Sequence, residues 1–133
     1  MSETSSSSSA SPASSSPASP APADIRDDRS RGLLEAYDGA TVTGRIAYFV
    51  LDGDPAALVA VHTVVEPAYE GRGIAGALVR RFYGIAAREG VPVVPLCPYA
   101  ARWAERHPEE APVPPAELVD AAKRQLKRDS PRW

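Results

Sequence analysis

The chain has 133 residues, and its 44% hydrophobic and 24% charged positions fit a single soluble domain with one core. Fifteen basic and seventeen acidic residues leave a formal charge of -2, so the chain has no overall attraction to nucleic acid or to an anionic membrane. No apolar run approaches the roughly 20 residues that span a bilayer, and the opening segment lacks the apolar core of a secretory signal, so we expect a cytoplasmic protein.

The first 24 residues are almost entirely Ser, Ala and Pro. Nothing large and apolar in this stretch offsets the entropy that would be lost on ordering it, so we predict a disordered tail for 1–24. A docking arm is the alternative interpretation of this segment.

The next stretch predicts a β-hairpin over 32–51, because two apolar runs flank the turn residues Asp38-Gly39. A second turn signal at 52–55 (DGDP) precedes a run that is apolar on both alternating faces. That run, 59–65, is typical of a central strand covered on two sides. We therefore expect three strands in an antiparallel meander.

The chain is organised around a glycine-rich stretch at 64–79 (VVEPAYEGRGIAGALV). Its β-branched start, its glycines and its amphipathic continuation predict a strand end, a tight turn and a helix. This helix is expected to begin near Ile74 and to end at a C-cap on Gly90. Residues 91–96 (VPVVPL) then predict a fourth strand, parallel to the third and reached by a crossover.

Two further helices are expected after Pro98. The first covers 99–106 and ends at His107-Pro108. The second carries an apolar stripe beside basic side chains, and we expect it to dock on the domain or on a partner, with nucleic-acid or membrane contact as the alternative. The stripe consists of Leu118, Val119, Ala122 and Leu126.

These elements predict an α/β (α+β) fold with a mixed sheet. The predicted organisation is a tail (1–24), a domain (25–110), and a loop with a basic amphipathic helix (111–133). A single cysteine excludes an internal disulfide and a multi-cysteine metal site, and only His62 and His107 could add imidazole ligands. We therefore expect no metal.

The spacing Gly71-x-Gly73-x-x-Gly76 matches that of a dinucleotide-binding loop. However, antiparallel strands precede it, whereas that loop belongs to tandem parallel βαβ units. The P-loop is also excluded, because no Gly-Lys-Ser/Thr closes the turn. The glycines alone leave two interpretations open, a phosphate site at a helix N-terminus and a structural tight turn.

Three short motifs in order favour the phosphate site. The pattern Val65-x-Pro67-x-x-x-Gly71-Arg72-Gly73-x-Ala75 resembles the acyl-CoA signature of the GNAT superfamily of N-acetyltransferases. The segment 95–100 (PLCPYA), with His62-Thr63 before it and 107–109 (HPE) after it, is similar to the small single-domain YjdJ-type branch. Glu70 departs from the signature, which commonly has Gln or Arg there, so we expect its side chain to point away from a bound pyrophosphate.

The resemblance implies a sheet whose two parallel strands splay apart, with acetyl-CoA (coenzyme A) in the resulting cleft as the co-substrate. Pantetheine would pair like an added strand with the backbone of the third strand, at Thr63, Val64 and Val65. Backbone amides would hold the pyrophosphate. The residues concerned are Gly71, Arg72, Gly73, Ala75 and Gly76.

Three side chains are candidates for the chemistry. Cys97 follows the fourth strand, where it has three possible roles: an acyl-accepting nucleophile, a wall of the acyl pocket, or an inert core residue. Tyr99 would protonate the departing thiolate, or it would simply pack the short helix. His62, expected on the same strand face as Leu58 and Ala60, would be a hydrogen-bonded core histidine or a general base.

The predicted function is transfer of an acetyl group from acetyl-CoA to an amine, on a small molecule or a protein. One alternative is a non-catalytic module of the same fold that binds acyl-CoA or a protein partner. A second is a redox sensor centred on Cys97. No nucleic acid or membrane is expected as a partner, and the chain would act as a monomer or a homodimer.

Overall fold

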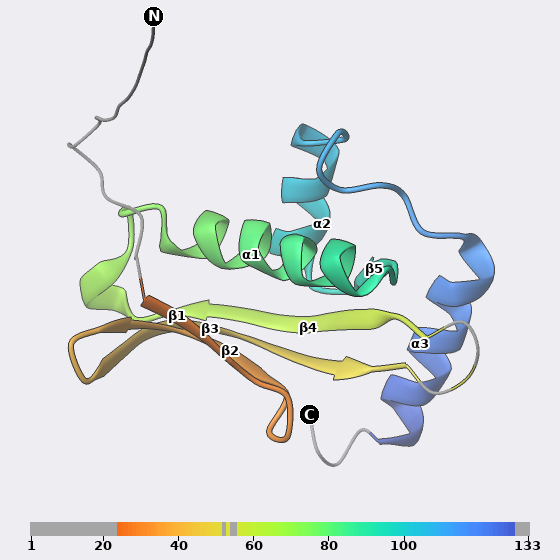
Figure 1. Ribbon diagram of the computed structural model, residues 1–133, viewed down its shortest axis with the longest axis horizontal. Coiled ribbons are helices and arrows are strands. Elements are labelled where there is room, and N and C mark those ends of the chain that lie inside the picture. The colour runs from red at the N-terminus through yellow and green to blue at the C-terminus, as the bar shows by residue number, and fades with distance from the viewer. Residues whose placement is uncertain (1–23, 52, 54–55, 130–133) are drawn as a thin grey trace, which may run out of the picture.

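The structure, a computed structural model, describes residues 24–51, 53 and 56–129 (Figure 1). The predicted tail, 1–24, therefore lies outside the described residues except for Asp24. Of the turn predicted at 52–55, only Gly53 is described.

Five strands form one sheet whose spatial order follows the chain. The strands are β1 (Asp24–Asp28), β2 (Leu33–Asp38), β3 (Thr41–Val50), β4 (Leu58–Val65) and β5 (Val93–Pro95). The first four pair antiparallel, and β5 pairs parallel to β4. The remaining elements are a 3-10 turn (Pro67–Tyr69) and the helices α1 (Ile74–Glu89), α2 (Pro98–Arg106) and α3 (Ala116–Arg128). This architecture confirms the predicted mixed α/β sheet.

The helices cover both faces of the sheet, α1 with α2 on one and α3 on the other (Figure 1). One core cluster joins α1 and α2 to alternate sheet residues such as Ile46, Leu58 and Ala60. The other cluster joins α3, through Leu118 and Ala122, to the opposite face. Both faces of β4 are therefore buried at its start, as its apolar run predicts. None of the described helices is long and apolar enough to cross a membrane.

The first strand, β1, is the element that the sequence did not predict. Its segment, DIRDD, has three aspartates and one apolar residue, a composition that disfavours strands. Pairing with residues 33–37 of β2 holds it in place, and Ile25 packs against the core. Beside it, the buried Tyr48 hydroxyl bonds Asp27, and Arg29 bonds both Tyr48 and Glu89 at the end of α1. These tertiary contacts override the local preference.

The other predicted elements are confirmed with small changes of boundary. The hairpin of β2 and β3 turns at Asp38-Gly39, and α1 begins at Ile74 and ends at a C-cap on Gly90. The fourth predicted strand, 91–96, shortens to Val93–Pro95, and the predicted meander gains a fourth strand. The last helix packs its apolar stripe on the sheet, so docking on the domain is the outcome here.

Gly44 in β3 lets the first turn of α1 approach the sheet. A Cβ on Gly44 would lie 3.0 Å from Ile74 Cγ2 and 3.1 Å from the carbonyl oxygen of Val64. Ile74 is the first residue of α1, so the missing side chain sets how closely the helix start sits on β3 and β4.

We predict that Gly44→Ala destabilises the protein by about 1–3 kcal/mol, because the added methyl meets backbone that cannot rotate away. Gly84→Ala is the matched control: it lies inside α1, and a Cβ there meets nothing within 4 Å. This control should stabilise the protein by about 0.5–1 kcal/mol, because glycine is a poor helix former. Urea denaturation of both variants tests the pair, and equal stability of Gly44→Ala and the wild type would contradict the close approach.

Candidate functional site

The glycine turn before α1 forms a nest of backbone amides. Gly71 and Gly73 have φ of +82° and +79°, in the left-handed region that other residues rarely adopt. Gly73 is the N-cap of α1 and supplies no capping side chain. The Ala77 amide makes the first bond of the helix, to the Gly73 carbonyl at 3.0 Å, and no described group accepts from the amides of Ala75 or Gly76. These N–H groups are available to an anion at the positive end of the helix dipole.

The space beside Gly71 and Gly73 of this nest is open. A Cβ built on Gly71 or on Gly73 would meet no atom within 4 Å. Arg72, between them, is exposed and holds its guanidinium 5.0 Å from the ring centroid of Tyr69. The nest therefore combines uncapped amides, room for a ligand and one nearby positive charge, which is what a phosphate group needs. Glu70 is exposed, and its amide bonds the Pro67 carbonyl.

The edge of β4 beside the nest loses its strand neighbour. Pairing with β5 stops at Ala60 opposite Pro95, and the amides of Leu96 and Cys97 both donate to the Ala60 carbonyl. Beyond that point, among the strands of the described residues, Thr63, Val64 and Val65 pair only with β3. The parting of the two parallel strands confirms the predicted splay and gives an unpaired strand edge.

Cys97 lies at the point where the strands part, as the N-cap of α2. It is only 4% exposed and packs in the core cluster shared with α1 and α2. Its thiol donates a hydrogen bond to the Thr63 hydroxyl, with 3.2 Å between sulfur and oxygen. This contact between Cys97 and the side chain of Thr63 joins the ends of β5 and β4. The sequence predicts only a backbone role for Thr63.

Tyr99 and Trp103 bring α2 against the first turn of α1. A Cβ on Gly76 would lie 3.6 Å from the Tyr99 hydroxyl and 3.8 Å from Trp103 Nε1. Tyr99 is 40% exposed, and its hydroxyl borders the nest beside Gly76. The proximity of Trp103 to the nest was not predicted; the only sequence signal for it is its place on the apolar face of α2.

His62 is not the core histidine that the sequence predicts. A bulge in β4 leaves Val61 without a partner, since Ala47 pairs with His62 and Tyr48 pairs with Ala60. The extra residue reverses the alternation of faces, so His62 is exposed and lies on the opposite face from Ala60 and Thr63. The prediction that His62 shares a face with Leu58 and Ala60 is therefore wrong.

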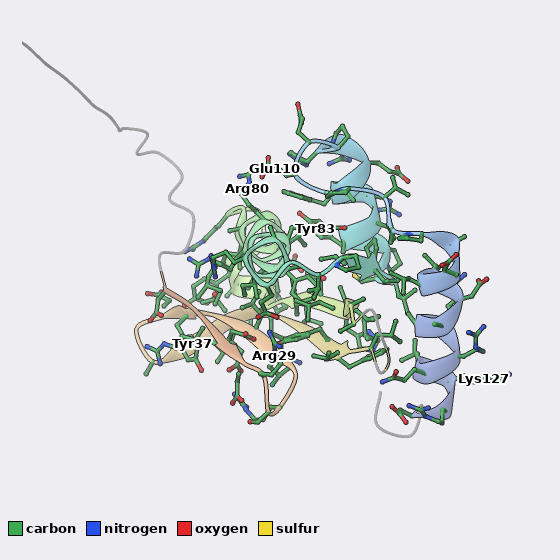
Figure 2. All side chains as sticks on the ribbon, turned by 45° about the vertical axis from the view of Figure 1, so that its right-hand side comes forward. Arg29, Tyr37, Arg80, Tyr83, Glu110 and Lys127 are labelled. Carbon is green, nitrogen blue, oxygen red and sulfur yellow. The ribbon has the colours of Figure 1, made fainter. Side chains whose placement is uncertain are left out.

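Two further side chains of this region, Arg80 and His107, have partners of their own. Arg80 makes an ion pair with Glu110 at 2.8 Å and lies over the Trp103 ring (Figure 2). The Arg80 hydrogen bond lowers the pKa of Glu110 below its usual value. His107 is the C-cap residue of α2, and its Nδ1–H donates a hydrogen bond to the Trp103 carbonyl oxygen, with 2.9 Å between nitrogen and oxygen. Within the described residues no group of three or more His, Cys, Asp or Glu is placed to hold a metal ion.

We predict that Cys97 is alkylated by iodoacetamide at least about 100-fold more slowly in the native protein than in guanidinium, because the buried thiol reacts only when the structure opens. Mass spectrometry against time measures both rates. Thr63→Val should keep the native rate low, since burial rather than the hydrogen bond protects the sulfur. Rapid labelling of the native protein would contradict the burial of Cys97.

Comparison with known proteins gives a family match and a partial structural likeness. The sequence model of the GCN5-related N-acetyl-transferase family matches residues 34–113, which include the nest, Cys97 and Tyr99. No curated protein sequence matches the chain significantly. The structure of an aminoglycoside acetyltransferase from an uncultured soil metagenomic sample is similar with a TM-score of 0.43 and 25% identity, over 47% of this chain and 43% of that chain. The chain thus spans less than half the length of that protein, and the family match alone carries the assignment.

Proposed function

The chain belongs to the GCN5-related N-acetyltransferase family, and we propose that it transfers an acetyl group from acetyl-CoA to an amine. The observation that carries this proposal is the uncapped amide nest at the start of α1. It lies beside the edge of β4 that β5 leaves unpaired beyond Ala60. The nest offers donors for a diphosphate, and the strand edge offers donors and acceptors for an amide-bearing arm. Acetyl-CoA contains both groups in one molecule.

In the proposed complex the pyrophosphate accepts hydrogen bonds from the turn and from the first residues of α1. The fit rests on the open space around the turn, where a Cβ on Gly73 would meet nothing. The charge of Arg72 adds attraction for the phosphates. The pantetheine arm lies along β4 and replaces the strand neighbour that β5 ceases to provide. The amides assigned to the pyrophosphate are those of Gly71, Arg72, Gly73, Ala75 and Gly76, and the strand residues are Thr63, Val64 and Val65.

The thioester would then lie near Cys97, where the strands part. A neutral amine attacks the acetyl carbon, a C–N bond forms, the C–S bond breaks, and the amine gives up a proton to water. A backbone N–H near Val65 polarises the carbonyl, and the Tyr99 hydroxyl gives its proton to the departing thiolate. Cys97, buried and bonded to Thr63, serves as a wall of the acetyl pocket in this proposal.

The second candidate function is binding of acyl-CoA without turnover. The position of His62 favours it. His62 is the general base that the sequence suggests, but it lies on the opposite face of β4 from Thr63 and so away from the proposed thioester. Both functions share the nest, so binding of CoA does not separate them. Release of free thiol in the presence of a panel of amines separates the two functions, because only an enzyme raises that release above the rate of thioester hydrolysis.

We predict that Gly73→Glu lowers CoA affinity at least about 100-fold, because it puts bulk and negative charge where the pyrophosphate approaches. Isothermal titration with CoA measures the affinity. Gly90→Glu is the matched control: Gly90 has a φ of +73°, its Cβ would also meet nothing within 4 Å, and it lies at the other end of the same helix. Both variants carry the same backbone strain and the same charge, so only their position differs.

The control should bind CoA as the wild type does. Equal loss of affinity in the two variants would show that strain or net charge is responsible and would remove the nest from the proposal. Wild-type affinity in Gly73→Glu would have the same consequence.

The catalytic roles are tested by Tyr99→Phe and Cys97→Ala, with thiol release followed at saturating acetyl-CoA. Loss of the proposed acid should lower kcat by about 10²- to 10⁴-fold while CoA affinity persists. Loss of a pocket wall should leave kcat within about tenfold of the wild type. A near-complete loss of turnover in Cys97→Ala, with CoA still bound, would instead assign Cys97 as the acyl-accepting nucleophile.

A further inference from the structure

β4 carries one side-chain hydroxyl, and it lies where β4 and β5 part. The strand reads LVAVHTVV, so Thr63 is its hydroxyl-bearing residue. The Cys97 thiol donates to Thr63 Oγ1, with 3.2 Å between sulfur and oxygen, which uses the hydroxyl as an acceptor. Within the described residues no group accepts a hydrogen bond from the same hydroxyl. The other polar side chain of β4, His62, lies on the opposite face.

The contact with Cys97 determines where the Thr63 hydroxyl can donate. A hydroxyl has one proton to donate, accepts through its lone pairs, and places its proton in staggered positions around the C–O bond. Because the thiol hydrogen occupies the position that faces the sulfur, the hydroxyl proton points away from Cys97. Accepting a hydrogen bond also makes the hydroxyl a stronger donor.

The Thr63 hydroxyl is the more accessible member of this pair. The contact is partly buried, with Thr63 partly exposed and Cys97 only 4% exposed. Beyond Ala60 the edge of β4 beside Thr63 has no partner from β5. A ligand that lies along this edge therefore meets the hydroxyl without displacing the thiol from the core.

We propose that Thr63 is a catalytic residue whose hydroxyl donates a hydrogen bond to the carbonyl oxygen of the bound thioester. This inference rests on the proposed acetyl transfer and adds a side-chain donor to the backbone N–H near Val65. Cys97 is then a positioning residue, because its thiol orients the hydroxyl of Thr63.

The hydrogen bond from Thr63 strengthens as the reaction proceeds. While the amine forms its bond to the acetyl carbon, the carbonyl electron pair moves onto the oxygen, and a donor aimed at that oxygen stabilises the negative charge. The charge returns to the carbonyl when the C–S bond breaks and Tyr99 protonates the thiolate. Thr63 keeps its own proton throughout, so the amine proton still leaves to water.

Binding tests the contact without turnover, because CoA lacks the acetyl carbonyl that acetyl-CoA carries. Thr63→Val keeps the shape of the side chain and removes the donor. It should weaken acetyl-CoA about three- to tenfold, as expected for one hydrogen bond, and leave CoA unchanged. Isothermal titration measures both affinities. Infrared spectra of bound acetyl-CoA, labelled with ¹³C at the carbonyl, should show a lower stretching frequency in the wild type than in Thr63→Val.

Thr43→Val is the matched control. Thr43 lies in β3, is 2% exposed, and donates its hydroxyl to the Ala36 carbonyl. The same substitution there removes a buried hydrogen bond and should lower stability. It should leave the ratio of the two affinities and the carbonyl frequency as in the wild type.

Turnover separates a catalytic role from a structural one. Thr63→Val should lower kcat for thiol release about 10²- to 10³-fold, as loss of an oxyanion donor does in other enzymes. Thr63→Ser keeps the donor and should stay within about tenfold of the wild type. Cys97→Ala keeps the hydroxyl and should lose less than Thr63→Val. Equal losses in these two variants would overturn the proposal, because the thiol would then be the acting group.

The outcomes distinguish this inference from the proposed function. If the wild type acetylates amines while Thr63→Val keeps the wild-type affinity ratio and carbonyl frequency, the Thr63 contact is overturned and acetyl transfer stands. A lower kcat in Thr63→Val with an unchanged frequency would also overturn the contact, because Thr63 would then act on the structure alone. A wild type that binds neither CoA nor acetyl-CoA would contradict the proposed function and this inference together.

Discussion

The last hydrogen bonds between β4 and β5 determine the arrangement of the candidate site. One carbonyl, that of Ala60, accepts from both Leu96 and Cys97, and the two parallel strands separate immediately after it. The chain that follows β5 therefore turns away into α2, while β4 continues beside β3 alone. A single branching point thus produces an open strand edge, places a thiol beside it and directs α2 across the first turn of α1.

The branching point lies inside a core that is covered on both faces of the sheet. Helices α1 and α2 cover one face of β4, and α3 covers the other, so the strand is buried at Ala60 from both sides. The bulge at Val61 lies directly beyond the branch and exchanges the two faces of the strand. As a result Thr63 turns toward Cys97 and His62 turns away from it. The chemistry that the site can support depends on this one extra residue.

Much of the fold follows from local signals, and the remainder from tertiary ones. Apolar periodicity located α1 and α3, and the glycines at each end of α1 located its boundaries. The sequence did not predict β1, because this charged segment becomes a strand only through its pairing with β2. The orientation of His62 was not predicted either, because the residue pattern of a single strand does not indicate a bulge. The contact of Cys97 with Thr63 and the burial of the Tyr83 hydroxyl could not be predicted from the sequence, because both depend on how elements distant in the chain pack together.

The composition of β1 bears on how two copies of the chain can associate. β1 is one edge of the sheet, and no described strand pairs with its outer row of backbone groups. Its three aspartates would face a second negative strand if two such edges met, and like charges oppose that pairing. A continuous sheet across two molecules is thus disfavoured at this edge.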